Sequence, residues 1–275
     1  MKLLKIQRFI AILYIFFLLP FPLHAQQDST GRVIAFFTGK NDLAHISFIA
    51  EAHPWLTKEC AAAGLQYDTS SNWAAMTPAL LSRYRLVILL DTRPDLPQAR
   101  QALEQYMKKG GGLLAFHFSA FALTPSAYPD NWSWYHHELL GAGSYKGNTW
   151  RPVSAILQVM DSTHPVTKGL PSLFRSAPNE WYSWQEDLRN NPDIQLLLSI
   201  DSSSFPLGTG PKPHEIWHQG FYPVVWAHRR YKMVYINMGH NDMDYEGGTN
   251  RTLSHSFGVA AQDQLIRQAL RWLAL

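Results

Sequence analysis

Continuous apolar runs of six or seven residues constrain the fold of this chain most strongly. The first half contains three of them: residues 32–37 (RVIAFF), 84–90 (YRLVILL) and 113–118 (LLAFHF). None alternates strictly between apolar and polar side chains, so each predicts a strand that is buried on both faces. Strands of this kind belong to parallel sheets whose two faces are covered by helices. The first half therefore predicts an α/β fold.

Helix signals separate these runs. Residues 47–63 have helical character, and residues 94–112 carry Pro97 near the first turn and three glycines as the stop. Residues 124–149 read as a loop crowded with aromatic side chains. Further strands are expected at residues 152–160, 194–200, 222–228 and 231–238, and a last helix at about residues 260–273. This order predicts a three-layer sandwich with a central, mostly parallel sheet, in a single domain over residues 26–275.

The first 25 residues have the pattern of a secretory signal peptide. Three basic residues precede an apolar run from Phe9 to Leu23, and an acceptable cleavage site ends at Ala25. The run is shorter than the roughly 20 apolar residues of a membrane span, and two prolines interrupt it. We therefore expect cleavage near Ala25 and a periplasmic or secreted mature protein without a membrane span.

The net charge of the chain narrows the classes of partner. Three of the 24 basic residues lie in the predicted leader, which leaves 21 basic against 21 acidic residues. A balanced charge does not favour nucleic acid or an anionic membrane as partner.

The single cysteine, Cys60, rules out an internal disulfide despite export. It lies beside three alanines, so we expect a small buried residue rather than a reactive thiol.

Three histidines stand at or shortly after the ends of predicted strands. His45 lies in the predicted loop after the first strand, His117 ends the third, and His240 follows residues 231–238. Parallel α/β folds bind ligands beyond these strand ends, so three histidines there favour a shared site, although a single one is more often structural. Imidazole can exchange a proton near neutral pH or bind a divalent metal. The chain has no HExxH or comparable motif, so both roles, and a divalent metal as cofactor, stay open.

Two carboxylates complete the candidate site, Glu180 as a catalytic residue and Asp242 as a substrate-binding residue. Glu180 is flanked by Trp181 and Tyr182, an apolar setting that can raise its pKa and suit it to general acid–base work. Asp242 follows His240 by two residues and can orient an imidazole or a substrate hydroxyl. The alternatives are a surface or hydrogen-bonding role for Glu180 and a turn role for Asp242.

Two short segments are unusually rich in aromatic residues. They contain Trp132, Trp134, Tyr135, Trp181, Tyr182 and Trp184, and Asp130 and Asn131 precede the first of them. Flat rings pack well against the C–H faces of sugars, so one interpretation is a sugar-binding surface that includes Trp132, Trp134 and Tyr182. The alternatives are a satellite core under a long loop and a contact in a homo-oligomer.

These segments resemble the ThuA-like family, named for trehalose utilisation, whose fold is similar to the class I glutamine amidotransferase sandwich. The resemblance covers most of residues 32–273 and rests on AHIS, GGGLLAFH, WYHHELLGAGSY, DSTHPVTKGLP, NEWYSW and VVWAHRRYKMVYINMGHNDMDY. It implies a flavodoxin-like, class I glutamine amidotransferase-like architecture. In amidotransferases the sharp turn after this strand presents a nucleophilic cysteine, whereas this chain presents His117. Glutaminase activity is therefore not implied.

The resemblance also implies site residues and a role. His45, His117, Glu180 and His240 match recurrent positions of the family, His164 matches a recurrent His-Pro that reads as a turn device, and the segment 247–258 with His255 has no match. ThuA-like proteins are associated with disaccharide use and with oxidoreductases that make 3-keto-sugars. The partner expected from this is a small-molecule carbohydrate.

We therefore expect an exported enzyme of carbohydrate catabolism that acts on a sugar, glycoside or 3-keto-sugar by acid–base or metal-assisted chemistry. Fold does not fix chemistry, so two rivals stay open. One is a non-catalytic sugar-binding or accessory protein that uses the same cleft. The other is a metal-dependent hydrolase that acts on a substrate other than a sugar.

Overall fold

The computed structural model describes residues 31–40, 42–122, 132–204 and 220–275. The predicted leader, Asp130 and Asn131 lie outside the described residues. In the described part of the chain, no helix has the length and apolar character needed to cross a membrane.

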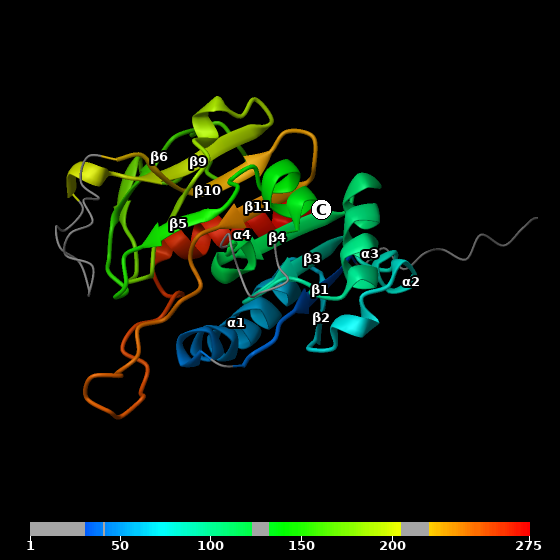
Figure 1. Ribbon diagram of the computed structural model, residues 1–275, viewed down its shortest axis with the longest axis horizontal. Coiled ribbons are helices and arrows are strands. Elements are labelled where there is room, and N and C mark those ends of the chain that lie inside the picture. Colours follow the sequence, from blue (N-terminus) through cyan, green and yellow to red (C-terminus); the bar gives the residue numbers. More distant parts are fainter. Residues whose placement is uncertain (1–30, 41, 123–131, 205–219) are drawn as a thin grey trace, which may run out of the picture.

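A nine-stranded sheet forms the centre of the described chain (Figure 1), in the order β2-β1-β3-β4-β11-β10-β9-β6-β7. Its strands are β1 Arg32–Phe36, β2 Gln66–Ser70, β3 Leu86–Leu89, β4 Gly112–Phe116, β6 Ile156–Val159, β7 Leu173–Arg175, β9 Ile194–Ile200, β10 Tyr222–His228 and β11 Met233–Ile236. The half from β2 to β11 is parallel, and the half from β11 to β7 is antiparallel. A separate antiparallel pair joins β5 (Tyr145–Asn148) to β8 (Tyr182–Trp184).

Helices cover both faces of the parallel half (Figure 1). The helices α1 (Leu43–Ala62) and α4 (Ala260–Ala274) pack on one face, and α2 (Pro78–Leu81) and α3 (Pro97–Lys108) pack on the other. Successive residues of a strand point to opposite faces. In β4, Leu114 faces the core under α1 and α4, while Leu113 faces the core under α3. This double coverage explains why β4 is apolar at every position.

The predicted α/β three-layer sandwich is confirmed. The strands β9 and β10 occupy the residues expected for them, and the last helix begins at Ala260 as expected. The expected helix at residues 47–63 begins four residues earlier, because the carboxylate of Asp42 accepts a hydrogen bond from the Ala44 N–H and caps α1. His45 therefore lies in the first turn of α1, and the prediction that it lies in a loop is wrong.

The prediction of a loop at residues 124–149 is also wrong in part. Its described residues contain a π-helical segment at Trp134–Leu139 and the strand β5. The sequence prediction missed β2 as well. This strand lies at the edge of the sheet and has the polar sequence QYDTS, so it lacks the apolar run of a strand that is covered on both faces.

Cys60 is predicted to be chemically inert in the folded protein. Its side chain is fully buried in the core under α1, and burial, with a smaller contribution from the charge of Glu59, raises the pKa of the thiol to about 12. At pH 8 the thiolate is the reactive form and is almost absent. We expect a colorimetric disulfide reagent to leave the native protein unlabelled and to label one thiol after unfolding in urea. Rapid labelling of the native protein would contradict this.

Candidate active site

Three histidines from distant parts of the chain meet at the carboxyl edge of the parallel strands. The ring centroids of His45 and His240 lie 5.0 Å apart, and each lies 5.5 Å from that of His117. β4 and β11 pair in parallel with Phe116 opposite Ile236, so His117 and the loop that carries His240 leave the sheet at the same level. The N-terminus of α1 brings His45 to the same place.

His117 stands at a sharp turn from β4 into a short 3₁₀ helix at His117–Ala120. Its φ is 35°, an uncommon conformation for a residue with a Cβ, and the Tyr235 hydroxyl donates to its carbonyl at 2.9 Å. The imidazole is fully buried and stacks on the Tyr182 ring at 4.1 Å. The sharp turn therefore holds the imidazole in a fixed, buried position and does not expose it to solvent.

The two nitrogens of His117 have different partners. Nδ1 lies 3.3 Å from Asn237 Oδ1, and Nε2 lies 3.3 Å from Glu180 Oε2. The Asn237 amide nitrogen donates to the Tyr182 carbonyl at 3.1 Å, which leaves its oxygen to face His117. Both contacts of the ring are hydrogen bonds only if His117 carries two protons or Glu180 carries one. The geometry of His117 and Glu180 therefore allows one proton to pass between them.

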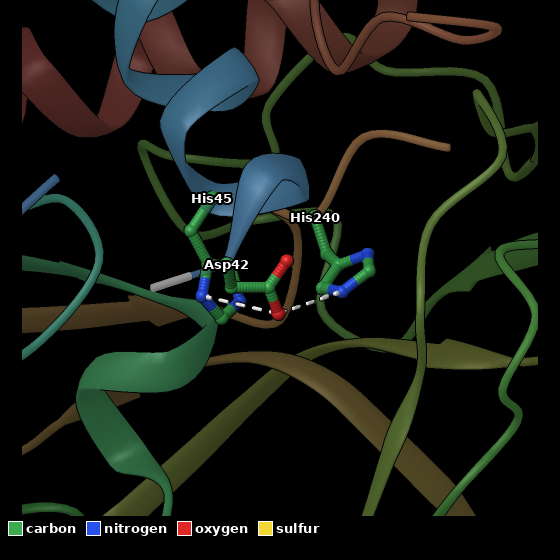
Figure 2. A group of neighbouring side chains, drawn as sticks. All are labelled: Asp42, His45 and His240. Atoms are coloured by element: carbon green, nitrogen blue, oxygen red, sulfur yellow. Dashed lines mark ion pairs between the residues drawn. The ribbon is translucent and has the colours of Figure 1, made fainter. Parts of the chain in front are cut away.

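Asp42 joins the other two histidines (Figure 2). Its Oδ2 lies 3.8 Å from Nδ1 of His45 and 3.7 Å from Nε2 of His240, and the carboxylate stands between the two rings. Glu180 Oε2 lies 3.8 Å from Nε2 of His240, which links the two groups into one cluster. Asp42 is not among the site residues predicted from the sequence. The available signal was its position as an N-cap residue three places before His45.

Burial and mutual charges set the protonation of the histidines. Burial, together with the charges of His240 and His117, holds the pKa of His45 well below its usual value. Burial also lowers the pKa of His117, against the opposing effect of Glu180. For His240 burial acts in the same direction, but interactions with Asp42 and Glu180 outweigh it and raise its pKa. The pKa of His240 is therefore shifted in the opposite direction from those of its two neighbouring histidines.

Burial and neighbouring charges shift the pKa values of the two carboxyl groups in opposite directions. Burial alone would raise the pKa of each, but the neighbouring histidines outweigh it. The interaction with His240 is the main cause for Asp42, and the contact with His117 is the main cause for Glu180, so both pKa values fall below their usual range. The lowered pKa values favour the ionised form of both carboxyl groups, which suits them to bind a cation, and the expectation that the apolar setting of Glu180 raises its pKa is wrong.

A network of buried polar groups fixes the loop after β11. Asn179 Oδ1 accepts from the Gly239 N–H at 3.1 Å and from the Ser256 hydroxyl at 3.3 Å. Glu51 of α1 accepts from the Asn241 amide at 3.1 Å and from the Ser256 N–H at 3.0 Å. Because Asn179 and Glu180 are adjacent, the same segment positions Glu180 and the loop that carries His240.

Gly239 is required for the close approach of this loop to His117. Its φ is 139°, and an added Cβ would lie 3.2 Å from both the His117 Cβ and the Phe48 ring. The histidine cluster therefore depends on a glycine immediately before His240.

A cleft of about 900 Å³ opens beside the cluster. Asp42 and His45 contribute to its wall, whereas His117 lies behind them, fully buried. Its lining also includes Lys40, Trp73, Asp91, Arg93, Phe118, Phe121, Trp150 and Tyr245. A ligand in this cleft would therefore meet Asp42 and His45 first, among aromatic rings and groups of both charges.

The structure does not place the predicted tryptophans in this cleft. Trp132 is buried and stacks on Tyr135 in the core on the α3 face, and Trp134 packs edge-on against Tyr231. Tyr182 is the exception among the predicted substrate-binding aromatics, because it stacks on His117. The described indoles that line the cleft are instead Trp73 and Trp150. The interpretation of Trp132 and Trp134 as part of a satellite core fits this packing.

The remaining sequence candidates lie around the cluster. The backbone N–H of Asp242 donates to the Ser254 hydroxyl at 2.8 Å, and its charge helps to raise the pKa of His240. His164 holds a turn, since its Nδ1 accepts from the Val166 N–H. His255 is exposed and faces Glu51. Asp242 therefore combines a turn role with an electrostatic effect on His240.

The fold and this site define a class I glutamine amidotransferase-like sandwich in which a histidine occupies the sharp turn after the central strand. The chain belongs to the ThuA family, described as trehalose utilisation, whose model matches residues 33–257. This membership links the protein to carbohydrate use.

One solved structure supports this family assignment, and two others share the fold. A ThuA-like protein from Bacteroides uniformis is 31% identical, with 88% of this chain and 91% of that chain covered and a TM-score of 0.74. A ThuA-like protein from Parabacteroides merdae is 18% identical, with 89% and 90% covered and a TM-score of 0.60. PurLQS from Thermotoga maritima shares the fold at 11% identity, with 89% and 99% covered and a TM-score of 0.50. A comparison with the curated proteins gives no match.

Asn237 is predicted to be a strong determinant of stability at this site. Asn237→Ala removes the partner of His117 Nδ1 and of the Tyr182 carbonyl, both in buried surroundings. A buried group without its partner costs about 1–3 kcal/mol. We expect a loss of this size in the free energy of unfolding, measured in urea, and a change within about 0.5 kcal/mol for the exposed control Asn190→Ala. Equal stability of Asn237→Ala and the unsubstituted protein would contradict the proposed contact.

Proposed function

We propose that this protein is an exported enzyme of carbohydrate catabolism that moves protons on a sugar, glycoside or 3-keto-sugar. The observation that carries the proposal is the His117–Glu180 pair, which is linked through His240 to Asp42 and His45 at the wall of the cleft. Membership of the ThuA family supports a carbohydrate as the substrate. The signal pattern of residues 1–25 supports export.

The burial of each group suggests its role. Glu180 is 5% exposed and faces both His117 and His240, so it is the candidate for direct proton transfer. His117 is fully buried behind it and acts as the partner that gives or takes the proton of Glu180. His45 and Asp42, which contribute to the cleft wall, would contact the polar groups of the sugar.

A keto group makes this chemistry accessible. A carbonyl acidifies the neighbouring C–H, so a carboxylate can take that proton while the electron pair moves onto the carbonyl oxygen to form an enediolate. Return of the proton to the former carbonyl carbon, with transfer of the neighbouring hydroxyl proton to the former carbonyl oxygen, isomerises the sugar. Departure of an oxygen substituent from the adjacent carbon, with the proton delivered to that oxygen, completes an elimination. Both outcomes need a group that takes the carbon-bound proton and gives a proton back, which is the role proposed for the His117–Glu180 pair.

Turnover is predicted to depend on Glu180. We expect a screen of glucosides, disaccharides and their 3-keto forms, followed by mass spectrometry, to identify a substrate of the mature protein. Glu180→Gln keeps the size of the side chain but removes its basicity, so kcat/KM should fall by about 10²- to 10⁴-fold. The exposed control Glu186→Gln should retain the activity of the unsubstituted protein.

Two results would contradict this. Unchanged turnover in Glu180→Gln would exclude the acid–base role. Binding of a sugar by calorimetry without consumption of any compound in the screen would identify a non-catalytic binding protein instead.

Export is predicted to remove the leader. If residues 1–25 are a signal peptide, the protein recovered from the periplasm or medium should begin at Gln26, as measured by intact mass and N-terminal sequencing. Recovery of a chain that still begins at Met1 would contradict the proposed processing.

A further inference from the structure

We infer that Asp42, His45 and His240 form a binding site for a divalent transition-metal ion, with Zn²⁺ as the best fit, next to the cleft. One ligand atom from each residue lies within 4.8 Å of the other two. Figure 2 shows the Asp42 carboxylate between the two imidazoles, which approach it from α1 and from the loop after β11. Metal binding at this site does not depend on the proposed function. The chemical role of the bound ion does rest on the proposed function.

The distances within the site are better explained by a shared ion than by hydrogen bonds. Asp42 Oδ2 lies 3.8 Å from Nδ1 of His45 and 3.7 Å from Nε2 of His240, beyond normal hydrogen-bond lengths. Two ligand atoms that each lie about 2.1 Å from a tetrahedral ion are about 3.4 Å apart. A shift of a few tenths of an ångström would bring the two pairs that include Asp42 to that separation.

The two imidazoles lack the partners expected of structural histidines. The side chains of His45 and His240 are 8% and 3% exposed. Among the described residues, Nε2 of His45 and Nδ1 of His240 are buried and have no hydrogen-bond partner. The opposite nitrogen of each ring, Nδ1 of His45 and Nε2 of His240, is the one nearest Asp42 Oδ2, so these two atoms are the candidate ligands of the ion. His117 provides the contrast, because both of its nitrogens face polar atoms.

Asp42 is oriented for this role by its other oxygen. Oδ1 accepts from the Ala44 N–H at 2.9 Å and from the Tyr245 hydroxyl at 3.2 Å. These two contacts hold the carboxylate so that Oδ2 faces the imidazoles. Outer contacts of this kind orient the carboxylates of metal sites.

The donor set selects the class of ion. Two imidazoles and one carboxylate are typical ligands of Zn²⁺ and related transition-metal ions, whereas Mg²⁺ and Ca²⁺ prefer oxygen ligands. With three protein ligands, such an ion keeps positions open for oxygen atoms of a substrate, and Asp42 and His45 lie in the wall of the cleft. In the proposed function it would polarise a carbonyl or hydroxyl oxygen of the sugar, while Glu180, 3.8 Å from His240, moves the proton.

The test is direct metal binding to the mature protein after removal of bound metal with a chelator. Titration with Zn²⁺ in a calorimeter should give one site per chain. Co²⁺ should give visible d–d absorption bands that Zn²⁺ abolishes. Mg²⁺ and Ca²⁺ should not compete at equal concentration.

Variants assign the site to its residues. Asp42→Asn retains a good helix cap but loses the charged ligand, and His240→Gln retains a polar side chain of similar length. Each should weaken Zn²⁺ binding by more than about 100-fold, the upper end of the loss seen for outer contacts. The exposed control His255→Gln should bind as the unsubstituted protein does. Circular dichroism melting in chelator verifies that every variant is folded.

The outcomes separate this inference from the proposed function. Absence of Zn²⁺ and Co²⁺ binding, or equal binding in the unsubstituted protein and a folded Asp42→Asn variant, would overturn the metal site. Sugar turnover that survives both chelation and the Asp42→Asn substitution would also overturn the role of the metal ion in catalysis. That result would leave the proposed function intact. Zn²⁺ binding that is lost in Asp42→Asn, without consumption of any sugar, would support the metal site and contradict the proposed function.

Discussion

The parallel pairing of β4 with β11 is the constraint on which the site depends. It places Phe116 opposite Ile236, so His117 and Asn237 leave the sheet side by side and contact each other. Since β4 also pairs with β3, and β3 with β1, the loop that starts α1 reaches the same edge. A shift of one residue in the β4–β11 register would turn the neighbouring side chains to the opposite face and separate His117 from its partners.

The site concentrates ionisable groups where burial opposes charge. An isolated buried charge is costly, and only close, complementary partners make it tolerable. Here Glu180 lies between two histidines, and Asp42 lies between His45 and His240. The strained backbone of His117 adds to this cost, and the hydrogen bond from Tyr235 to its carbonyl helps to hold it in place. Such concentrated strain and charge are characteristic of functional sites.

Sequence patterns predict the layers of this fold better than the contacts of its site. Continuous apolar runs identify β9 and β10, because strands covered on both faces leave a clear signal, whereas the polar edge strand β2 leaves none. The three histidines could be expected at one edge of the sheet. The contact of His117 with Glu180 could not, because it depends on the order of the strands in space. Aromatic content likewise cannot tell which face a ring occupies, and Trp132 packs into the core.

The fold retains the sharp turn of the amidotransferase sandwich but changes what that turn presents. An amidotransferase needs an exposed thiol there, whereas here a fully buried imidazole faces Glu180. The members of the cluster that line the cleft, Asp42 and His45, belong instead to the start of α1, where Asp42 accepts a hydrogen bond from the Ala44 N–H. The positive end of a helix dipole stabilises a nearby anion by about 0.3–1 kcal/mol. The cluster therefore reaches the cleft at the N-terminus of α1, where a carboxylate and two imidazoles meet, and His117 lies buried behind them.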